Sequence, residues 1–243
     1  MNSADRYQTA LYYDLTASNY DADVDGVPVN AAARLVFCSL VEKAAGPTGR
    51  ILDFGCGTGT DAHWYAQRGH DVIAYDISSG MLDQLIAKCA NDITNGRIVV
   101  ADDRSVGLAA TMRTHGPIDI IAANFAVLNH LDDLHAGLAE LSDYLKPNGT
   151  LVASFINPTN IRDMRTGWWW RAALRDLTAG NITVRGDVTN YRYFVREVRR
   201  AAKPALRVTQ ITPGPPPRMG LSRFAPLRLR TGALFVTMRK AAP

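Results

Sequence analysis

Two aspartates and a glycine-rich turn form the part of the sequence with the clearest chemical capacity. Asp53 ends an apolar run, and Gly55, Gly57 and Gly59 follow it closely. Because glycine has no Cβ, such a turn lets a ligand approach the backbone. Asp76 closes the next apolar run, where a carboxylate is suited to accept hydrogen bonds from both hydroxyls of a ribose. The pattern therefore predicts a site for a ribose-containing ligand.

The spacing of the glycines separates two kinds of ligand. A dinucleotide fingerprint reads G-x-G-x-x-G. Here the turn reads G-x-G-x-G, and Thr60 stands where the last glycine would be. The sequence therefore disfavours a dinucleotide, which makes a nicotinamide-dependent oxidoreductase the weakest alternative.

These residues need a sheet that brings them to one edge. Apolar runs predict strands at 50–54, 71–75, 97–101, 118–123 and 150–155, separated by helical patterns near 60–68, 79–90, 105–114 and 132–145. Such alternation indicates a parallel sheet covered by helices on both faces. Ligands bind at the carboxyl ends of such strands, where Asp53 and Asp76 stand.

The two ends of the chain follow other patterns. Residues 29–45 are typical of an amphipathic helix, and 193–203 are again helical. Strands are expected at 205–211 and 233–239, on either side of a proline-rich stretch. Residues 158–192 have no clear period, which indicates an insertion after the fifth strand.

Five motifs in a fixed order carry a resemblance to a known family. They occupy residues 51–59, 76–82, 101–102, 117–121 and 145–151. Together they resemble the class I S-adenosylmethionine-dependent methyltransferases over about residues 50–155. The chain departs from the family where the segment after Asp102 lacks a short leucine-proline stretch, and where Asn148 replaces a frequent glycine. Neither departure touches the groups expected to hold the cofactor.

The resemblance implies a Rossmann-like α/β fold with three layers, α/β/α. Its seven-stranded sheet is mostly parallel, with the last strand antiparallel between its neighbours. N-terminal helices and the insertion after strand 5 are added to this sheet. We expect one domain over 1–243, with an N-terminal helical lid at 1–46, a cofactor-binding core at 47–157, a substrate-lid insertion at 158–192 and a C-terminal helix and strands at 193–243.

The resemblance also implies roles for individual residues. Asp76 would take the ribose hydroxyls, Ile77 and Met81 would flank the adenine, and Asp102 or Asp103 would accept from the adenine amino group. Asp53 would support the turn or accept from the cofactor's amino group. The expected cofactor-binding residues are Tyr20, Asp53, Gly55, Cys56, Gly57, Gly59, Asp76, Ile77, Met81, Asp102, Asp103, Asn124 and Phe125.

The acceptor side of the site has weaker signals. His130 is a candidate general base, with packing or capping of the next helix as the alternative. Asn129, Trp168 and Trp169 are candidate substrate residues, and the tryptophans alternatively pack a core. No metal site is expected. The segment expected to choose the acceptor, 158–231, has no recognisable motif.

Composition limits the location and the partners. The formal net charge is +4, but residues 1–157 carry −9 and residues 158–243 carry +13, which raises the question of an anionic substrate, an acidic carrier protein or RNA. Three cysteines, an odd number, favour a reducing cytoplasm over a disulfide framework. No apolar run is long enough to span a membrane.

The sequence thus predicts an enzyme that transfers a methyl group from S-adenosyl-L-methionine to an oxygen, or a nitrogen, of a small-molecule acceptor, with S-adenosyl-L-homocysteine as the product. The acceptor is anionic or carrier-bound in one version of this hypothesis. An RNA methyltransferase and a non-catalytic S-adenosylmethionine-binding protein are the alternatives. Nucleic acid is disfavoured because no RNA-binding module is recognised. Pairing of two subunits stays open.

Overall fold

A seven-stranded sheet runs through the centre of the computed structural model, which describes residues 3–216 and 226–241. The strands are β1 Arg50–Phe54, β2 Asp71–Tyr75, β3 Ile98–Ala101, β4 Ile118–Ala123, β5 Leu145–Ile156, β8 Leu206–Pro213 and β9 Ala233–Lys240. Their order is β3-β2-β1-β4-β5-β9-β8. Strands β1 to β5 pair in parallel, whereas β9 runs antiparallel between β5 and β8. This arrangement confirms the expected fold.

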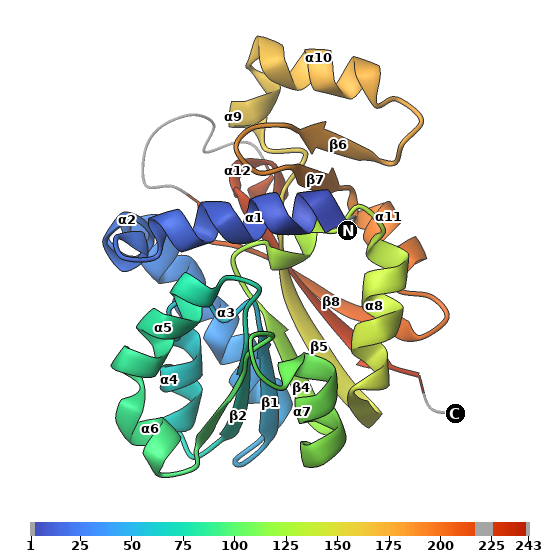
Figure 1. Cartoon of the computed structure of the whole chain (residues 1–243). Helices are drawn as coiled ribbons and strands as arrows, with labels where there is room; N and C mark the ends of the chain where they lie inside the picture. Colours follow the sequence, from blue (N-terminus) through green and yellow to red (C-terminus); the bar gives the residue numbers. More distant parts are fainter. Residues whose placement is uncertain (1–2, 217–225, 242–243) are drawn as a thin grey trace.

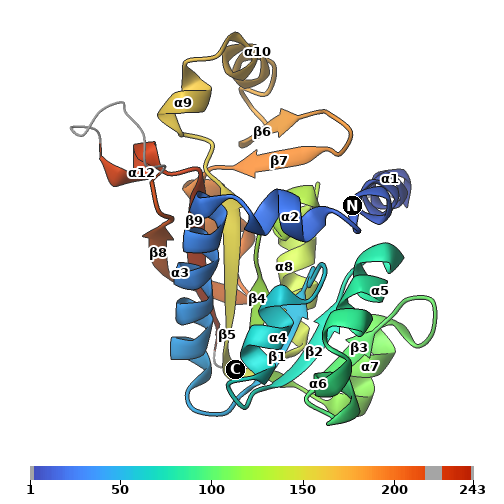
Figure 2. The same cartoon turned by 90° about the vertical axis from the view of Figure 1, so that its left-hand side faces the viewer.

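Helices cover both faces of the sheet (Figures 1 and 2). One face packs against α3 Pro28–Ala45, α4 Thr60–Ala66, α5 Ser79–Lys88 and α6 Ala90–Thr94; the other packs against α7 Gly107–His115, α8 Leu134–Asp143 and α11 Val195–Ala201. Successive strand residues point to opposite faces. Thus Ile51 packs with the first group of helices and Leu52 with the second. Both faces are buried, which is why the strands read as continuous apolar runs.

The predicted elements agree closely with the observed ones in this core. Strand β1 matches its prediction residue for residue, and the helix expected over 79–90 divides into α5 and α6. Ser78 caps α5, because its Oγ accepts a hydrogen bond from the backbone N–H of Met81 at 3.1 Å. The main difference is β5, which begins at Leu145 rather than near 150.

Two groups of elements lie over the carboxyl ends of the strands (Figures 1 and 2). The first is α1 Ser3–Thr16 with α2 Tyr20–Asp25. The second follows β5 and precedes α11 in the sequence. It consists of α9 Ile161–Met164, α10 Gly167–Arg175 and the hairpin of β6 Asn181–Val184 and β7 Asn190–Tyr193. This hairpin was not predicted, because its strands are short and lack an alternating apolar pattern.

Helix α12 Leu227–Arg230 lies between β8 and β9 in the sequence. Residues 217–225, part of the segment expected to choose the acceptor, lie outside the described residues, and α12 Leu227–Arg230 follows them. Among the helices of the described chain, none combines the length and the apolar character that a membrane crossing requires.

Gly59 lies so close to helix α5 that a side chain at this position would not fit. Its φ is +85°, and a Cβ there would lie 2.6 Å from Leu85 Cγ. Gly69 has a similar φ of +88° with nothing within 4 Å of a Cβ. We expect Gly69→Ala to lower the free energy of unfolding by about 1–2 kcal/mol through left-handed strain. Gly59→Ala should cost about 1–3 kcal/mol more through overpacking. Urea unfolding measures both, and equal costs would contradict the close contact.

Candidate functional site

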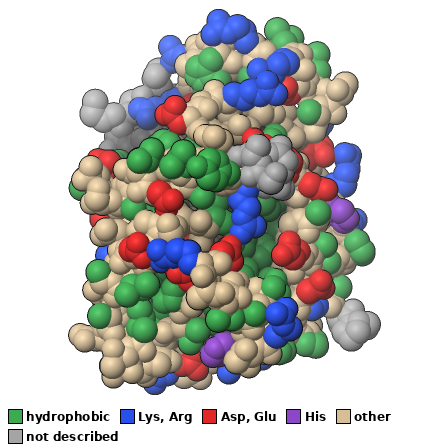
Figure 3. Space-filling view, viewed as in Figure 1, with side chains coloured by type: hydrophobic (Ala, Val, Ile, Leu, Met, Phe, Trp, Pro, Cys, Tyr) green, Lys and Arg blue, Asp and Glu red, His purple; other side chains and the backbone are tan. Residues whose placement is uncertain are grey.

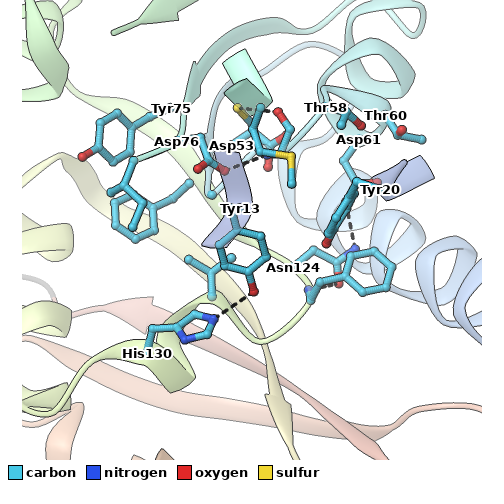
Figure 4. A pocket seen from close by; sticks show the side chains of 18 of the residues that line it. Tyr13, Tyr20, Asp53, Thr58, Thr60, Asp61, Tyr75, Asp76, Asn124 and His130 are labelled. Carbon is cyan, nitrogen blue, oxygen red and sulfur yellow. Dashed lines mark hydrogen bonds between the residues drawn. The ribbon is translucent and has the colours of Figure 1, made fainter. Parts of the chain in front are cut away.

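A pocket lies at the carboxyl ends of β1, β2 and β4, beneath α1 and α2 (Figure 4). It brings together residues from distant parts of the chain, including most of those predicted from the sequence. The predicted residues that line it are Tyr20, Asp53, Gly55, Cys56, Gly57, Asp76, Ile77, Met81, Asn124, Phe125 and His130.

The glycine turn is fixed to the end of β2 by hydrogen bonds. The backbone N–H groups of Gly55 and Cys56 both donate to the carbonyl oxygen of Tyr75, at 2.8 and 3.0 Å. The N–H of Gly57 donates to Asp76 Oδ2 at 2.9 Å. The turn and the carboxylate that closes β2 therefore form one rigid unit on the pocket wall.

Asp76 has the environment of a ligand-binding carboxylate. Its Oδ1 accepts the backbone N–H of Ser78 at 2.9 Å, and its Oδ2 accepts that of Gly57. The backbone N–H of Ile77 also acts on this carboxylate. Because two carboxylate oxygens offer about four lone pairs, Asp76 retains capacity for a ligand hydroxyl. Burial raises the pKa of Asp76 to about 6, although the backbone donors act in the opposite direction.

Asp53 contributes an unsatisfied acceptor. Its side chain is buried, and among the described residues nothing donates a hydrogen bond to its Oδ2. Burial, reinforced by the neighbouring charge of Asp61, raises the pKa of Asp53 well above its ordinary value. A buried acceptor without a partner is costly. A ligand that places an ammonium group against this oxygen would satisfy it and favour the charged carboxylate.

Asp61 was not singled out from the sequence. It lies in the first turn of α4 and is buried, and its carboxylate accepts from the Arg34 guanidinium and, at 2.8 Å, from Asn124 Nδ2. Arg34 also lies over the ring of Phe125, 4.6 Å from its centroid. An acidic residue in the first turn of a helix is common because it interacts favourably with the helix dipole. The sequence therefore gave no reason to expect Asp61 in the pocket.

His130 and Tyr13 form a hydrogen-bonded pair at the pocket (Figure 4). The Tyr13 hydroxyl lies 3.2 Å from His130 Nε2, and His130 Nδ1 lies 3.2 Å from the backbone carbonyl of Thr189. A carbonyl can only accept, so the proton of the neutral ring belongs on Nδ1 and Nε2 accepts from Tyr13. Burial lowers the pKa of His130 and raises that of Tyr13. The ring is therefore held neutral, with its basic nitrogen toward the pocket.

Helix α1 is attached to the far side of the same site. Asp14 accepts hydrogen bonds from Ser78 Oγ and from the backbone N–H of Gly80, both at 2.7 Å. A carboxylate at this position also interacts favourably with the positive, N-terminal end of the α5 dipole. The segment that follows Asp76 is thus held by α1 from above.

Three predicted cofactor residues lie outside the pocket lining. Asp102 accepts from Arg104 Nε at 2.9 Å, and Asp103 accepts from Arg6 and Tyr75, at 2.7 and 2.9 Å. Gly59 instead forms the start of α4. The role in adenine binding predicted for Asp102 or Asp103 remains a prediction.

The predicted substrate residues also lie elsewhere. Trp169 is buried with Ala172 and Ile182, and its Nε1 donates to the carbonyl of Pro158 at 2.8 Å. Trp168 packs against the same small core. Asn129 donates to the carbonyl of Tyr191 at 2.7 Å and accepts from the N–H of Ile156 at 3.1 Å. These contacts hold the β6–β7 hairpin and the segment before it in place, so all three residues have structural roles that account for their burial.

One group of metal-binding residue types occurs outside the pocket. Single ligand atoms of His63, Cys89 and Asp92 lie within 4.8 Å of one another. Asp92 Oδ2 lies 2.6 Å from His63 Nδ1, and Asp92 Oδ1 accepts from Gln67 at 2.9 Å. These hydrogen bonds join α4 to α6 and explain the grouping without a metal.

Comparison with known proteins places this geometry in context. Residues 29–186 match the family described as a methyltransferase domain. A demethylmenaquinone methyltransferase of Renibacterium salmoninarum is 32% identical over 155 residues, which cover 63% of this chain and 60% of the relative. A malonyl-[acyl-carrier protein] O-methyltransferase of Enterobacter lignolyticus is 29% identical over 119 residues, which cover 49% and 43%. The matched part thus spans about half the length of these curated relatives.

The fold has solved counterparts. A Burkholderia thailandensis 1,6-didemethyltoxoflavin-N1-methyltransferase, solved with bound 1,6-didemethyltoxoflavin and S-adenosylhomocysteine, superimposes with a TM-score of 0.66. The superposition covers 99% of this chain and 92% of that one, at 16% identity. At this identity the likeness concerns the fold alone.

The pKa of Asp76 predicts how the stability of the ligand-free protein depends on pH. A carboxyl whose pKa is raised on folding, here from 3.8 to about 6, favours the folded state most at low pH. That contribution is lost as the pH rises through about 6. Because the side chain is partly exposed, we expect only about 1–2 kcal/mol.

Asp76→Asn removes this titration. The free energy of unfolding of the variant, relative to the wild type, should therefore rise by that amount between pH 4.5 and 7.5. Urea unfolding at the two pH values measures it. A difference that does not change with pH would contradict the raised pKa.

Proposed function

This chain belongs to the methyltransferase domain family, and we propose that it transfers a methyl group from S-adenosylmethionine to an oxygen, or a nitrogen, of a small-molecule acceptor. The observation that carries the proposal is the pairing of two carboxylates on either side of the glycine turn. Asp76 retains acceptor capacity for a ligand hydroxyl, and Asp53 presents a buried oxygen without a partner among the described residues.

The residues of the pocket fit each part of this cofactor. Asp76 would hold the two ribose hydroxyls, and Ile77 and Met81, both on the pocket wall, would flank the adenine. The turn around Gly57 would contact the methionine part, and Asp53 would accept from its ammonium group. Tyr20 also lines this part of the pocket, and its ring comes within 3.9 Å of the Cβ position of Gly57.

The chemistry divides between the cofactor and the protein. When bound, S-adenosylmethionine supplies a methyl group already activated by a positively charged sulfur. The chain must therefore align the acceptor, exclude water and take up a proton. Alignment of this kind contributes roughly 7–11 kcal/mol to lowering a barrier. Tyr13, Asn124 and Phe125 line the pocket and would serve this task.

His130 is our candidate for the proton acceptor. Its Nε2 is the basic nitrogen of the neutral ring and points toward the pocket, with the Tyr13 hydroxyl 3.2 Å away. An acceptor hydroxyl would lose its proton to Nε2 directly, or to the Tyr13 oxygen while Tyr13 passes its own proton to Nε2. Either route leaves an imidazolium whose Nδ1 proton is held by the carbonyl of Thr189.

The names of the relatives support a small or carrier-bound acceptor. One acts on demethylmenaquinone and another on malonyl-[acyl-carrier protein], by their names. The basic C-terminal part keeps an RNA acceptor as the second candidate. Against it, Arg196 and Arg200 of α11 both pair with Glu197, which reduces the charge available to a phosphate backbone. We also assign the protein to the cytoplasm, where its three free, buried cysteines would stay reduced.

Asp76→Ala tests the cofactor assignment directly. The variant should bind S-adenosylhomocysteine about 10- to 100-fold more weakly by calorimetry, because hydrogen bonds to a charged group contribute about 1.5–3 kcal/mol. Asp71→Ala is the matched control, since exposed Asp71 pairs with Arg97 outside the pocket lining, and should change affinity less than threefold. Unchanged affinity in folded Asp76→Ala refutes the ribose role.

His130→Ala tests the proton acceptor. With a hydroxyl acceptor found in a panel of phenols, carboxylic acids and amines, kcat should fall about 10²- to 10⁴-fold. Affinity for S-adenosylhomocysteine should stay within about threefold. Because the pKa of His130 is lowered, wild-type kcat should be flat above pH 7. His135→Ala, which removes an exposed histidine, is the control. Full turnover by His130→Ala would leave the residue a packing role only.

A further inference from the structure

Helix α10 exposes several large apolar side chains, although the Trp170 ring also contacts the edge of the Trp169 ring, with 4.9 Å between centroids. Trp170, Leu174 and Leu177 are 53%, 64% and 73% exposed. They follow one another at helical spacing, so they form a row along one side of the helix and its C-terminal extension. The opposite side of α10 is fully used, because Trp169 and Ala172 pack against Ile182 of β6. We call Trp170, Leu174 and Leu177 the outer apolar row.

Exposed basic side chains occur on the two helices α9 and α10. Arg171 follows Trp170 on the exposed half of α10, and Arg162 and Arg165 lie on and directly after α9. All three are exposed, and none has an ion pair with another residue in the described part of the chain. Figure 3 shows basic and apolar side chains side by side on the surface over α10. The positive charge is therefore available to a partner.

A second exposed row lies on α1. Tyr7, Leu11 and Leu15 are 64%, 39% and 76% exposed at a spacing of four residues, and Figure 3 shows a band of apolar side chains along this helix. The other side of α1 carries Tyr13, which lines the pocket. Both rows thus belong to the elements over the carboxyl ends of the strands (Figures 1 and 2).

We propose that α9 and α10 dock this protein peripherally on an anionic lipid bilayer, with the outer apolar row entering the headgroup region and Arg162, Arg165 and Arg171 contacting acidic headgroups. The pattern of tryptophan and leucine beside arginine is the composition of helices that lie in a membrane interface. Helix α10 lies at the outer end of the molecule in both views (Figures 1 and 2). A protruding helix can reach a flat bilayer without a matching groove in the partner.

Charge complementarity selects the lipid. Each arginine near an anionic surface increases binding about fivefold, and this gain is screened by salt. The apolar row adds a contribution that salt does not remove. Binding should therefore need acidic lipid, weaken at high salt and depend on both sets of side chains. None of this rests on methyl transfer, so the proposal stands or falls separately from the proposed function.

Vesicle flotation with the full chain tests the proposal. The wild type should float with vesicles of phosphatidylcholine containing about 30% phosphatidylglycerol, with a partition coefficient at least about tenfold above that for phosphatidylcholine alone. The triple variant W170S/L174S/L177S and the triple variant R162Q/R165Q/R171Q should each lose about tenfold or more. Leu35→Ser, which removes a leucine 62% exposed on α3, is the matched control and should float like the wild type.

Two measurements make the result decisive. Thermal unfolding of every variant, followed by circular dichroism, shows that the fold is retained. Sedimentation shows whether the wild type self-associates. Absent flotation of the wild type would overturn the proposal, as would triple variants that float as well as it does. The proposal would also be overturned if the wild type showed no lipid affinity but formed a dimer, or a complex with an acidic protein, through the outer apolar row.

Discussion

The site depends on one constraint: the turn after β1 is hydrogen-bonded to the end of β2. The carbonyl of Tyr75 receives two N–H groups of the turn, and the Asp76 carboxylate receives a third. Because β1 and β2 are neighbours in register, Asp53 and Asp76 are then held on either side of the turn. The pocket geometry is therefore a property of strand pairing, which no single side chain could provide.

The core of the fold could be predicted from the sequence because the paired strands leave a clear pattern. Strands buried on both faces leave long apolar runs, and the helices between them have regular spacing, so β1 to β4 could be located closely. The glycine turn and Asp76 could be assigned because both come directly after strands. The residues in the pocket that follow strands, such as Asn124, were predicted for the same reason.

The rest of the site was less accessible because it depends on tertiary contacts between irregular segments. Asp61 is buried by Arg34 of another helix, and Tyr13 is placed by packing of α1, so neither has a local signature. The sequence left the tryptophans open between a pocket wall and a small core, and the packing of Trp169 against Ile182 depends on the irregular segment around it. Asp102 follows a strand like Asp76, and its pairing with Arg104 depends on the local turn, so its adenine role stays a prediction.

The bonds from Asp14 to Ser78 and Gly80 have a consequence for the order of events. They attach α1, which covers the pocket, to the residues beside Asp76. Moving α1 away would remove the Asp14 carboxylate from the start of α5, next to the residues that we propose to bind the ribose. Under that proposal, entry and release of the cofactor would require this contact to open, so both would be coupled to the position of α1.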